Sequence, residues 1–398
     1  MKITIKRDKL FAKNKISTKL MLFFSLYFFV RLLFCIFTML MNTVPFICYD
    51  DYFIYDKIQQ LTKERILNLF AFRNCYYLIC MYLNKIRIFG VISGPRILNV
   101  VLFYFVCLKI RSIAEMLSYN NKTQKIIMCL FAVSPYFIIY SMIPLREVIC
   151  ALGVVYILWN FLRYEQGMNI NKLLLIFFFI ILYFTRVYVL EVLLFVIASY
   201  KCRKSKWYVK FIIVILALLS ALYFIRYSGT YLYVLNDKVE HYINNNIKST
   251  GHLSKLSING VSDLYKLFLL IPYVQMLPLP GAVEPYYTFN SWSGWITLFS
   301  GISAFNIPYF WIHIYRIFKY KDKDKNKELE MVIAIFYIIF LILIALTNPG
   351  NARFFFFINP VFYLFGINEF VRMKSKNNRN LLYGFFAASI PYIYLVIK

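Results

Sequence analysis

Long apolar stretches recur along almost the whole chain, from residue 20 to the C-terminus. Each runs for roughly 15–25 residues, the length that an α-helix needs to cross about 30 Å of hydrocarbon. The 398 residues are 61% hydrophobic and their mean hydropathy is +0.64, far above the values of a soluble domain. We therefore expect an all-α, polytopic integral membrane protein.

The basic residues predict how the chain crosses the membrane. With 45 Lys and Arg the net charge is +27, a value that can indicate nucleic-acid binding. Here the charges cluster in short loops beside apolar segments, so we interpret them as topology and expect no nucleic-acid partner. Because cytoplasmic loops carry the excess of Lys and Arg, the sequence predicts about eleven spans with the N-terminus in the cytoplasm. A basic stretch precedes the first span without a cleavage site, so this span is expected to stay uncleaved in a bacterial inner membrane.

The predicted spans form one membrane domain over residues 1–398. They are 19–41, 93–110, 126–143, 147–162, two short spans within 172–200, 209–226, 292–315, 330–347, 353–371 and 380–397. One long span over 172–200 would place the basic residues that follow it outside. Two short spans that break near Arg186 keep those residues inside, and we prefer this alternative.

Two large segments are predicted on the outer side. The first covers 42–92 and includes a short apolar stretch at 75–89, which polar residues interrupt and which is expected to be an interfacial helix. The second covers 227–291, where several prolines argue against a regular span.

Five arginines lie at or near the outer ends of predicted spans rather than in cytoplasmic loops. They are Arg73, Arg96, Arg146, Arg186 and Arg353. Arginine near lipid is costly unless it is paired or engaged, and its planar fork suits phosphate oxygens. Each could instead be neutralised by an acid, as in pairs of Arg186 with Glu191 or of Arg146 with Glu147. Five on one side of the membrane favour a binding site for lipid-linked phosphate.

Acidic residues follow the first span on the same outer side. Asp50 and Asp51, with Asp56 close behind, could act as a general base toward a sugar hydroxyl. They could also hold a divalent cation on a diphosphate. The alternative is a solvated acidic loop that only helps to set topology.

The histidines and cysteines do not form a metal-binding pattern. His241 and His252 are eleven positions apart, which fits no standard zinc motif, and we interpret them as surface residues. His313, near the inner end of its predicted span, is interpreted as structural. Cys48 and Cys75 both fall in the first outer segment, so a disulfide between them stays one alternative. No metal site is predicted from these residue types.

Short motifs occur in a definite order along the chain. They are Tyr49-Asp50-Asp51-Tyr52, Arg73-Asn74-Cys75-Tyr76-Tyr77, Arg96-Ile97-Leu98-Asn99, Ser134-Pro135-Tyr136, Leu145-Arg146-Glu147, Thr185-Arg186, and Asn351-Ala352-Arg353-Phe354-Phe355 followed by Pro360. In this order the chain resembles polytopic bacterial glycosyltransferases of the GT-C fold. It lacks a large C-terminal soluble domain, and in length and number of spans it is also similar to O-antigen and capsule repeat-unit polymerases.

The resemblance implies transfer of sugars from polyprenyl phosphate or diphosphate carriers at the outer membrane face. The acid of the first outer loop in such enzymes, a general base or metal ligand, corresponds to Asp50 or Asp51. The arginines would hold the departing polyprenyl diphosphate. The expected partners are a polyprenyl-linked sugar or oligosaccharide, membrane lipid and a regulator of polysaccharide chain length. A divalent cation is an optional cofactor.

Three functions follow from these expectations. The leading one is a repeat-unit polymerase of bacterial surface polysaccharide, and a transferase that adds one sugar from a polyprenyl monophosphate is the close alternative. A flippase or transporter is the alternative from another class. Transporters tend to show internal repeats and polar residues near the bilayer midplane, whereas the polar residues here gather at the outer rim.

Overall fold

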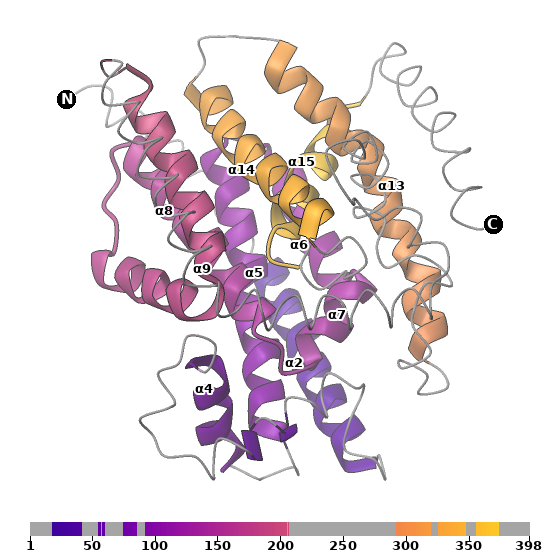
Figure 1. Cartoon of the computed structure of the whole chain (residues 1–398). Coiled ribbons are helices and arrows are strands. Elements are labelled where there is room, and N and C mark those ends of the chain that lie inside the picture. The colour runs from indigo at the N-terminus through magenta and orange to yellow at the C-terminus, as the bar shows by residue number, and fades with distance from the viewer. Residues whose placement is uncertain are drawn as a thin grey trace.

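The computed structural model of the chain is a bundle of α-helices (Figure 1). It describes residues 18–41, 55–56, 58–59, 75–85, 92–204, 206, 292–319, 325–347 and 356–373. Within these residues all regular secondary structure is helical. The predicted segments at 209–226, 227–291 and 380–397 lie outside the described residues.

The helices follow the apolar stretches of the sequence closely. They are α2 (Thr18–Met41), α4 (Cys75–Asn84), α5 (Ser93–Met116), α6 (Asn121–Val133), α7 (Pro135–Met142), α8 (Glu147–Glu165), α9 (Lys172–Lys201), the 3₁₀ helix η2 (Cys202–Lys204), α13 (Trp292–Lys319), α14 (Lys325–Thr347) and α15 (Asn359–Arg372). Among the described residues, four segments are long and apolar enough to cross a membrane, namely Lys19–Phe37 in α2, Ser93–Met116, Glu147–Glu165 and Lys172–Lys201. The chain is therefore an α-helical protein with the features of a membrane protein.

Helices α5 and α8 run side by side in the same direction. At their starts, the Asn99 amide donates to the carbonyl of Leu145 at 2.9 Å, and at their ends the Gln166 amide donates to the carbonyl of Met116 at 2.7 Å. We call the side of the bundle where α8 begins the Arg146 end and the side where it finishes the Glu165 end. The two ends differ in charge, as the positions of the basic residues show.

Basic residues gather at the Glu165 end. Lys201, at the end of α9, pairs with Glu165, and Arg203 pairs with Glu328, at the start of α14, at 2.7 Å. The last turn of α13 carries Arg316 and Lys319. This distribution is the one expected if the Glu165 end is the cytoplasmic side.

Aromatic rings fill the centre of the bundle between α5, α6, α7 and α15. Phe131 and Phe137 have ring centroids 4.2 Å apart, and Phe137 also lies 5.1 Å from Phe356 and 5.5 Å from Tyr363. Large apolar side chains such as Leu22 and Leu173 are instead exposed, at 72% and 83%. A core of packed rings with apolar residues on the outside is what a bundle in lipid requires, since close packing rather than exclusion of water holds such helices together.

The predicted span 126–143 is two helices rather than one. Ser134 adopts φ −61° and ψ 121°, outside the helical region, and Pro135 begins α7. Proline has no N–H to continue the helical hydrogen bonds, so the polar groups at the break need hydrogen-bond partners from other helices. The Tyr27 hydroxyl donates to the carbonyl of Ala132 at 3.0 Å, and the Tyr363 hydroxyl donates to Ser134 Oγ at 3.0 Å.

Helix α9 is also interrupted, at the residue near which the sequence predicts a break between two short spans. Arg186 has φ −153° and ψ 70°, between two helical halves. The first half packs on α8 through Phe178 and Tyr156, whose ring centroids are 4.6 Å apart, and the second half ends at the Lys201–Glu165 pair. Figure 1 shows α9 changing direction beside α8. Each half is about 21–22 Å long at 1.5 Å per residue, less than a full bilayer core, so two separate crossings stay a prediction.

Candidate functional site

Two of the five predicted arginines meet at the start of α8. Glu147 opens this helix and is 3% exposed, and Arg186 Nη2 donates to its Oε1 at 2.5 Å. The Nε of Arg146 lies 4.0 Å from the same oxygen. We call these three residues the Arg146 cluster. Arg186 thus pairs with Glu147 on another helix, and the predicted pair of Arg146 with Glu147 is confirmed.

The break in α9 allows Arg186 to reach this position. One turn earlier, Leu182 lies against Gly153 of α8, where an added Cβ would come within 2.9 Å of the Leu182 Cγ. Thr185 Oγ1 donates to the carbonyl of Ile181 at 2.6 Å and accepts a hydrogen bond from Cys150 Sγ at 3.2 Å. Because Gly153 has no side chain, the first half of α9 approaches α8 closely just before the chain leaves the helix at Arg186.

A buried asparagine holds the turn that carries Arg146. Asn99, with no exposed surface, donates to the carbonyls of Ile143 at 2.7 Å and Leu145 at 2.9 Å. Its own Oδ1 accepts a hydrogen bond from the Tyr76 hydroxyl at 3.1 Å. Buried carbonyls are costly to leave without donors, so α4 and α5 together fix the path of this turn.

The chain that follows the predicted acidic loop packs at the same end of the bundle. Ile58, 1% exposed, belongs to a buried apolar cluster with Tyr76, Leu145 and residues of α8 and α9, and Tyr55 lies partly buried against it.

Arg146 is the most accessible member of its cluster. Its side chain is 17% exposed, against 8% for Arg186 and 3% for Glu147. Burial lowers the pKa of Arg146, the neighbouring Arg186 lowers it further, and Glu147 raises it. Arginine keeps its charge in proteins despite such shifts. A guanidinium that reaches the surface beside a closed ion pair can offer its fork to phosphate or carboxylate oxygens.

The other predicted site residues have different outcomes. Arg96 lies in the first turn of α5, one helical turn before Asn99, and is 1% exposed. Four predicted residues, Asp50, Asp51, Arg73 and Arg353, lie outside the described residues, as do Cys48 and the side chain of Cys75. The structure thus brings Arg146 and Arg186 together and buries Arg96 at the start of a neighbouring helix.

Sequence reasoning missed a buried arginine in α2. Arg31 is 5% exposed and donates to the carbonyls of Phe137 at 2.9 Å and Ile138 at 2.8 Å, and to Ser141 Oγ. Its guanidinium carbon also lies 5.0 Å from the ring centroid of Phe103. The signal was present, because Arg31 is the only charged residue between positions 20 and 41, and a charge inside an apolar span marks a functional candidate.

A separate polar network lies at the Glu165 end. His313 Nδ1 is 3.4 Å from Glu369 and its Nε2 is 3.9 Å from Glu330, while Arg316 pairs with Glu369 at 2.6 Å. These residues join α13, α14 and α15, which agrees with a structural role for His313. Among the described residues, no group of three or more His, Cys, Asp or Glu side chains could hold a metal ion.

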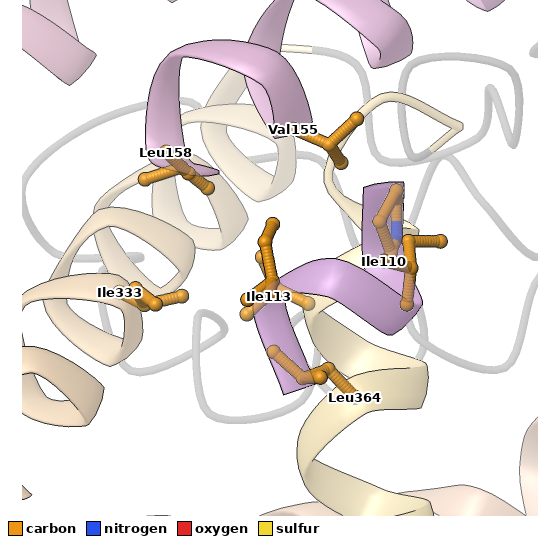
Figure 2. A pocket seen from close by; sticks show the side chains of 8 residues that line it. Ile110, Ile113, Val155, Leu158, Ile333 and Leu364 are labelled. Atoms are coloured by element: carbon orange, nitrogen blue, oxygen red, sulfur yellow. The ribbon is translucent and has the colours of Figure 1, made fainter. Parts of the chain in front are cut away.

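A small void between α5, α8, α14 and α15 is lined by apolar side chains alone. Figure 2 shows that apolar side chains surround it. They include Ile110, Ile113, Val155, Leu158, Ile333 and Leu364. Without a polar group it offers nothing to a phosphate or a sugar, so the Arg146 cluster is the better candidate site.

Comparisons with protein-family models, with curated proteins and with solved structures gave no match. Function must therefore be inferred from the residues and their arrangement.

Proposed function

We propose that the chain is a membrane glycosyltransferase of bacterial surface-polysaccharide synthesis, which joins polyprenyl-diphosphate-linked repeat units at the outer face of the inner membrane. The observation that supports this proposal is the position of Arg146, partly exposed beside the buried Glu147–Arg186 pair. The cluster lies at the end of the bundle opposite the basic helix ends of α9 and α13.

Transfer of a glycan from polyprenyl diphosphate leaves negative charge on the departing phosphates. Preorganised cations placed where that charge develops stabilise the transition state. Arg186, neutralised by Glu147, positions the start of α8, while Arg146 supplies the guanidinium fork. Arg96, Arg73 and Arg353 complete the proposed phosphate site.

The acceptor sugar needs a base at the same place. Asp50 or Asp51 has this role in the proposal, deprotonating the hydroxyl that attacks the donor. The packing of Ile58 and Tyr55 beside Leu145 supports a short path from the acidic loop to the Arg146 cluster. A divalent cation bound by these carboxylates would assist by neutralising the diphosphate.

The proposal includes a topology of about eleven spans with a cytoplasmic N-terminus. Cysteines introduced at position 51 and within 236–252 should then react with an impermeant maleimide added to intact spheroplasts. Cysteines at positions 204 and 323 should react only after the membrane is opened. The reverse pattern would overturn both the topology and the location of the site.

The glycans of a strain that lacks the gene distinguish the functions. If the chain is a polymerase, the deletion strain should make single complete repeat units but no long polysaccharide chains. The wild-type gene should restore the long chains, and a gene with Arg146→Lys should not. Incomplete repeat units would instead identify the chain as a single-sugar transferase that uses polyprenyl monophosphate.

One observation favours the transport alternative enough to test it in the same strain. Broken helices with charged residues at the break are frequent in transporters, and α9 breaks at Arg186. A flippase predicts that complete lipid-linked repeat units accumulate on the cytoplasmic side, where an impermeant glycan-oxidising reagent added outside spheroplasts cannot reach them. Complete units that are accessible from outside would argue against transport.

A further inference from the structure

A second group of basic side chains surrounds Trp159, away from the Arg146 cluster. The Nζ of Lys109, in α5, lies 3.3 Å from the ring centroid of Trp159, and the guanidinium carbon of Arg163 lies 4.6 Å from it. Lys109 also lies 5.2 Å from the ring centroid of Tyr156. We call Lys109, Trp159 and Arg163 the Trp159 group.

The charges of this group are not balanced by acids. Two cations beside one ring repel each other, and neither forms an ion pair with a carboxylate in the part of the chain that the structure describes. The indole Nε1 of Trp159 is buried and has no hydrogen-bond acceptor among the described residues. An ammonium and a guanidinium therefore lie against the same ring without a carboxylate partner, and each could donate to an anion.

The depth of the group matches a lipid headgroup. Lys109 is seven residues before the end of α5 and Arg163 two residues before the end of α8, which is about 10 Å and 3 Å at 1.5 Å per residue. Long basic side chains at such positions reach toward the interface, where tryptophan is also enriched. The Trp159 group thus lies near the membrane surface at the Glu165 end.

An exposed apolar strip leads from Lys109 toward the middle of the membrane. Phe105 and Val101 lie four and eight residues before Lys109, and so on the same face of α5. They are 45% and 40% exposed. The surface therefore combines a cationic head position with an apolar path, the complement of a phospholipid with a negative headgroup.

We propose that the Trp159 group binds the phosphate of an anionic phospholipid from the leaflet at the Glu165 end, with an acyl chain along Phe105 and Val101. Arg163 offers a bidentate fork and Lys109 a point charge to the phosphate oxygens. The attraction of anionic lipids to basic residues near a membrane surface supports the same assignment. The proposal does not depend on the function of the Arg146 cluster.

Native mass spectrometry of the full-length protein in detergent micelles tests the proposal, with phosphatidylglycerol and phosphatidylcholine as probes. The wild type should bind phosphatidylglycerol more tightly than phosphatidylcholine. Each of Lys109→Gln and Arg163→Gln should weaken that binding about fivefold, and the double variant about 25-fold, if each cation contributes as basic residues near charged membranes do. Lys109→Arg should bind like the wild type.

Arg203→Gln is the matched control. Arg203 lies at the same end, is 36% exposed and sits 4.0 Å from the ring centroid of Tyr200, but it is paired with Glu328. Its loss should leave phosphatidylglycerol binding unchanged. If Arg203→Gln weakened phosphatidylglycerol binding as much as the double variant does, the effect would come from the overall charge of the protein. That result would overturn the proposed site.

A quenching experiment keeps the proposal testable if the double variant does not fold. Brominated phosphatidylglycerol should quench the tryptophan fluorescence of the wild type more than brominated phosphatidylcholine does, and this excess should disappear in Trp159→Phe. No excess quenching in the wild type would refute the proposal. Inorganic phosphate should not abolish this excess quenching when it is added at the same concentration as the lipid. If it did, the site would bind a free anion, and the lipid assignment would be refuted.

Discussion

Replacing Glu147 by Gln should destabilise the protein far more than the loss of an ordinary surface acid. The variant keeps the shape of the side chain but leaves the guanidinium of Arg186, 8% exposed, without the carboxylate that it contacts at 2.5 Å. Removing one partner of a buried ion pair typically costs about 3–5 kcal/mol, because the other charge stays buried. We expect a loss within this range, since both side chains are almost fully enclosed and solvent screens them little.

The double-mutant cycle with Arg186→Gln separates this pair from general disruption. Arg186→Gln alone should also cost about 3–5 kcal/mol. The double variant buries no unpaired charge from this pair, so it should cost well below the sum of the two single changes. Arg146 loses a neighbour at 4.0 Å in that variant, but its side chain is partly exposed and can reach solvent. A coupling free energy of at least about 2 kcal/mol is expected.

The free energies can be measured by unfolding the purified protein in mixed micelles with increasing SDS. The Lys201–Glu165 pair is the control, because its side chains are 39% and 12% exposed and an exposed pair contributes about 0–1 kcal/mol. A coupling near zero for Glu147 and Arg186, or one no larger than that of the control pair, would refute the reasoning from burial.

Three further predictions concern the Arg146 end. Arg146→Lys keeps the charge but loses the bidentate guanidinium, and should lower polymer formation about 10–100-fold at unchanged protein abundance. The assay uses isolated membranes supplied with lipid-linked donor, and normal activity would remove Arg146 from the phosphate site. Asp50→Asn or Asp51→Asn should lower activity by about 10²–10⁴-fold if that residue is the general base, and full activity in both variants would contradict the assignment. Asn99→Ala should cost about 2–5 kcal/mol in the SDS assay, because two buried carbonyls lose their donor. Asn171→Ala, which removes only the exposed cap of α9 from the N–H of Leu174, should cost about 1 kcal/mol, and equal losses would show that the Asn99 bonds contribute little.

The sequence predicted those features that depend on neighbouring residues. The length of an apolar run and the charges at its ends are local properties, so the helices and the tight turn before Glu147 could be predicted. The break at Arg186 was predicted for the same reason, since the basic residues after Lys201 had to stay on one side. Pro135 gave a local signal for the break at Ser134, but a proline inside a long apolar run is compatible with an unbroken span.

Pairings between distant residues could not be predicted in this way. Arg186 and Glu147 are separated by 38 intervening residues, and Glu191, only five positions away, was the simpler choice. The partner was decided by packing, because Gly153 allows α9 to approach the start of α8. The carbonyl acceptors of Arg31 are more than a hundred residues away, and nothing in the sequence of α2 indicates them.

The buried arginines Arg31 and Arg186 have different kinds of partner, and each is associated with a helix break. Arg186 lies within the break in α9, where its side chain reaches a carboxylate on α8. Arg31 has its acceptors on α7, the short helix that follows the break at Ser134.

These contacts join the two helices that precede the proposed site residues in the sequence. Helix α2 leads toward Asp50 and Asp51, whereas α7 leads through the turn at Ile143 to Arg146. A single buried side chain therefore ties α2, which precedes the proposed base in the sequence, to α7, which precedes Arg146. Hydrogen bonds to backbone carbonyls in a low-dielectric interior are costly to break, so the relative position of α2 and α7 is strongly restrained. Such restraint is what a site needs if it is to hold an acid and a guanidinium at a fixed separation.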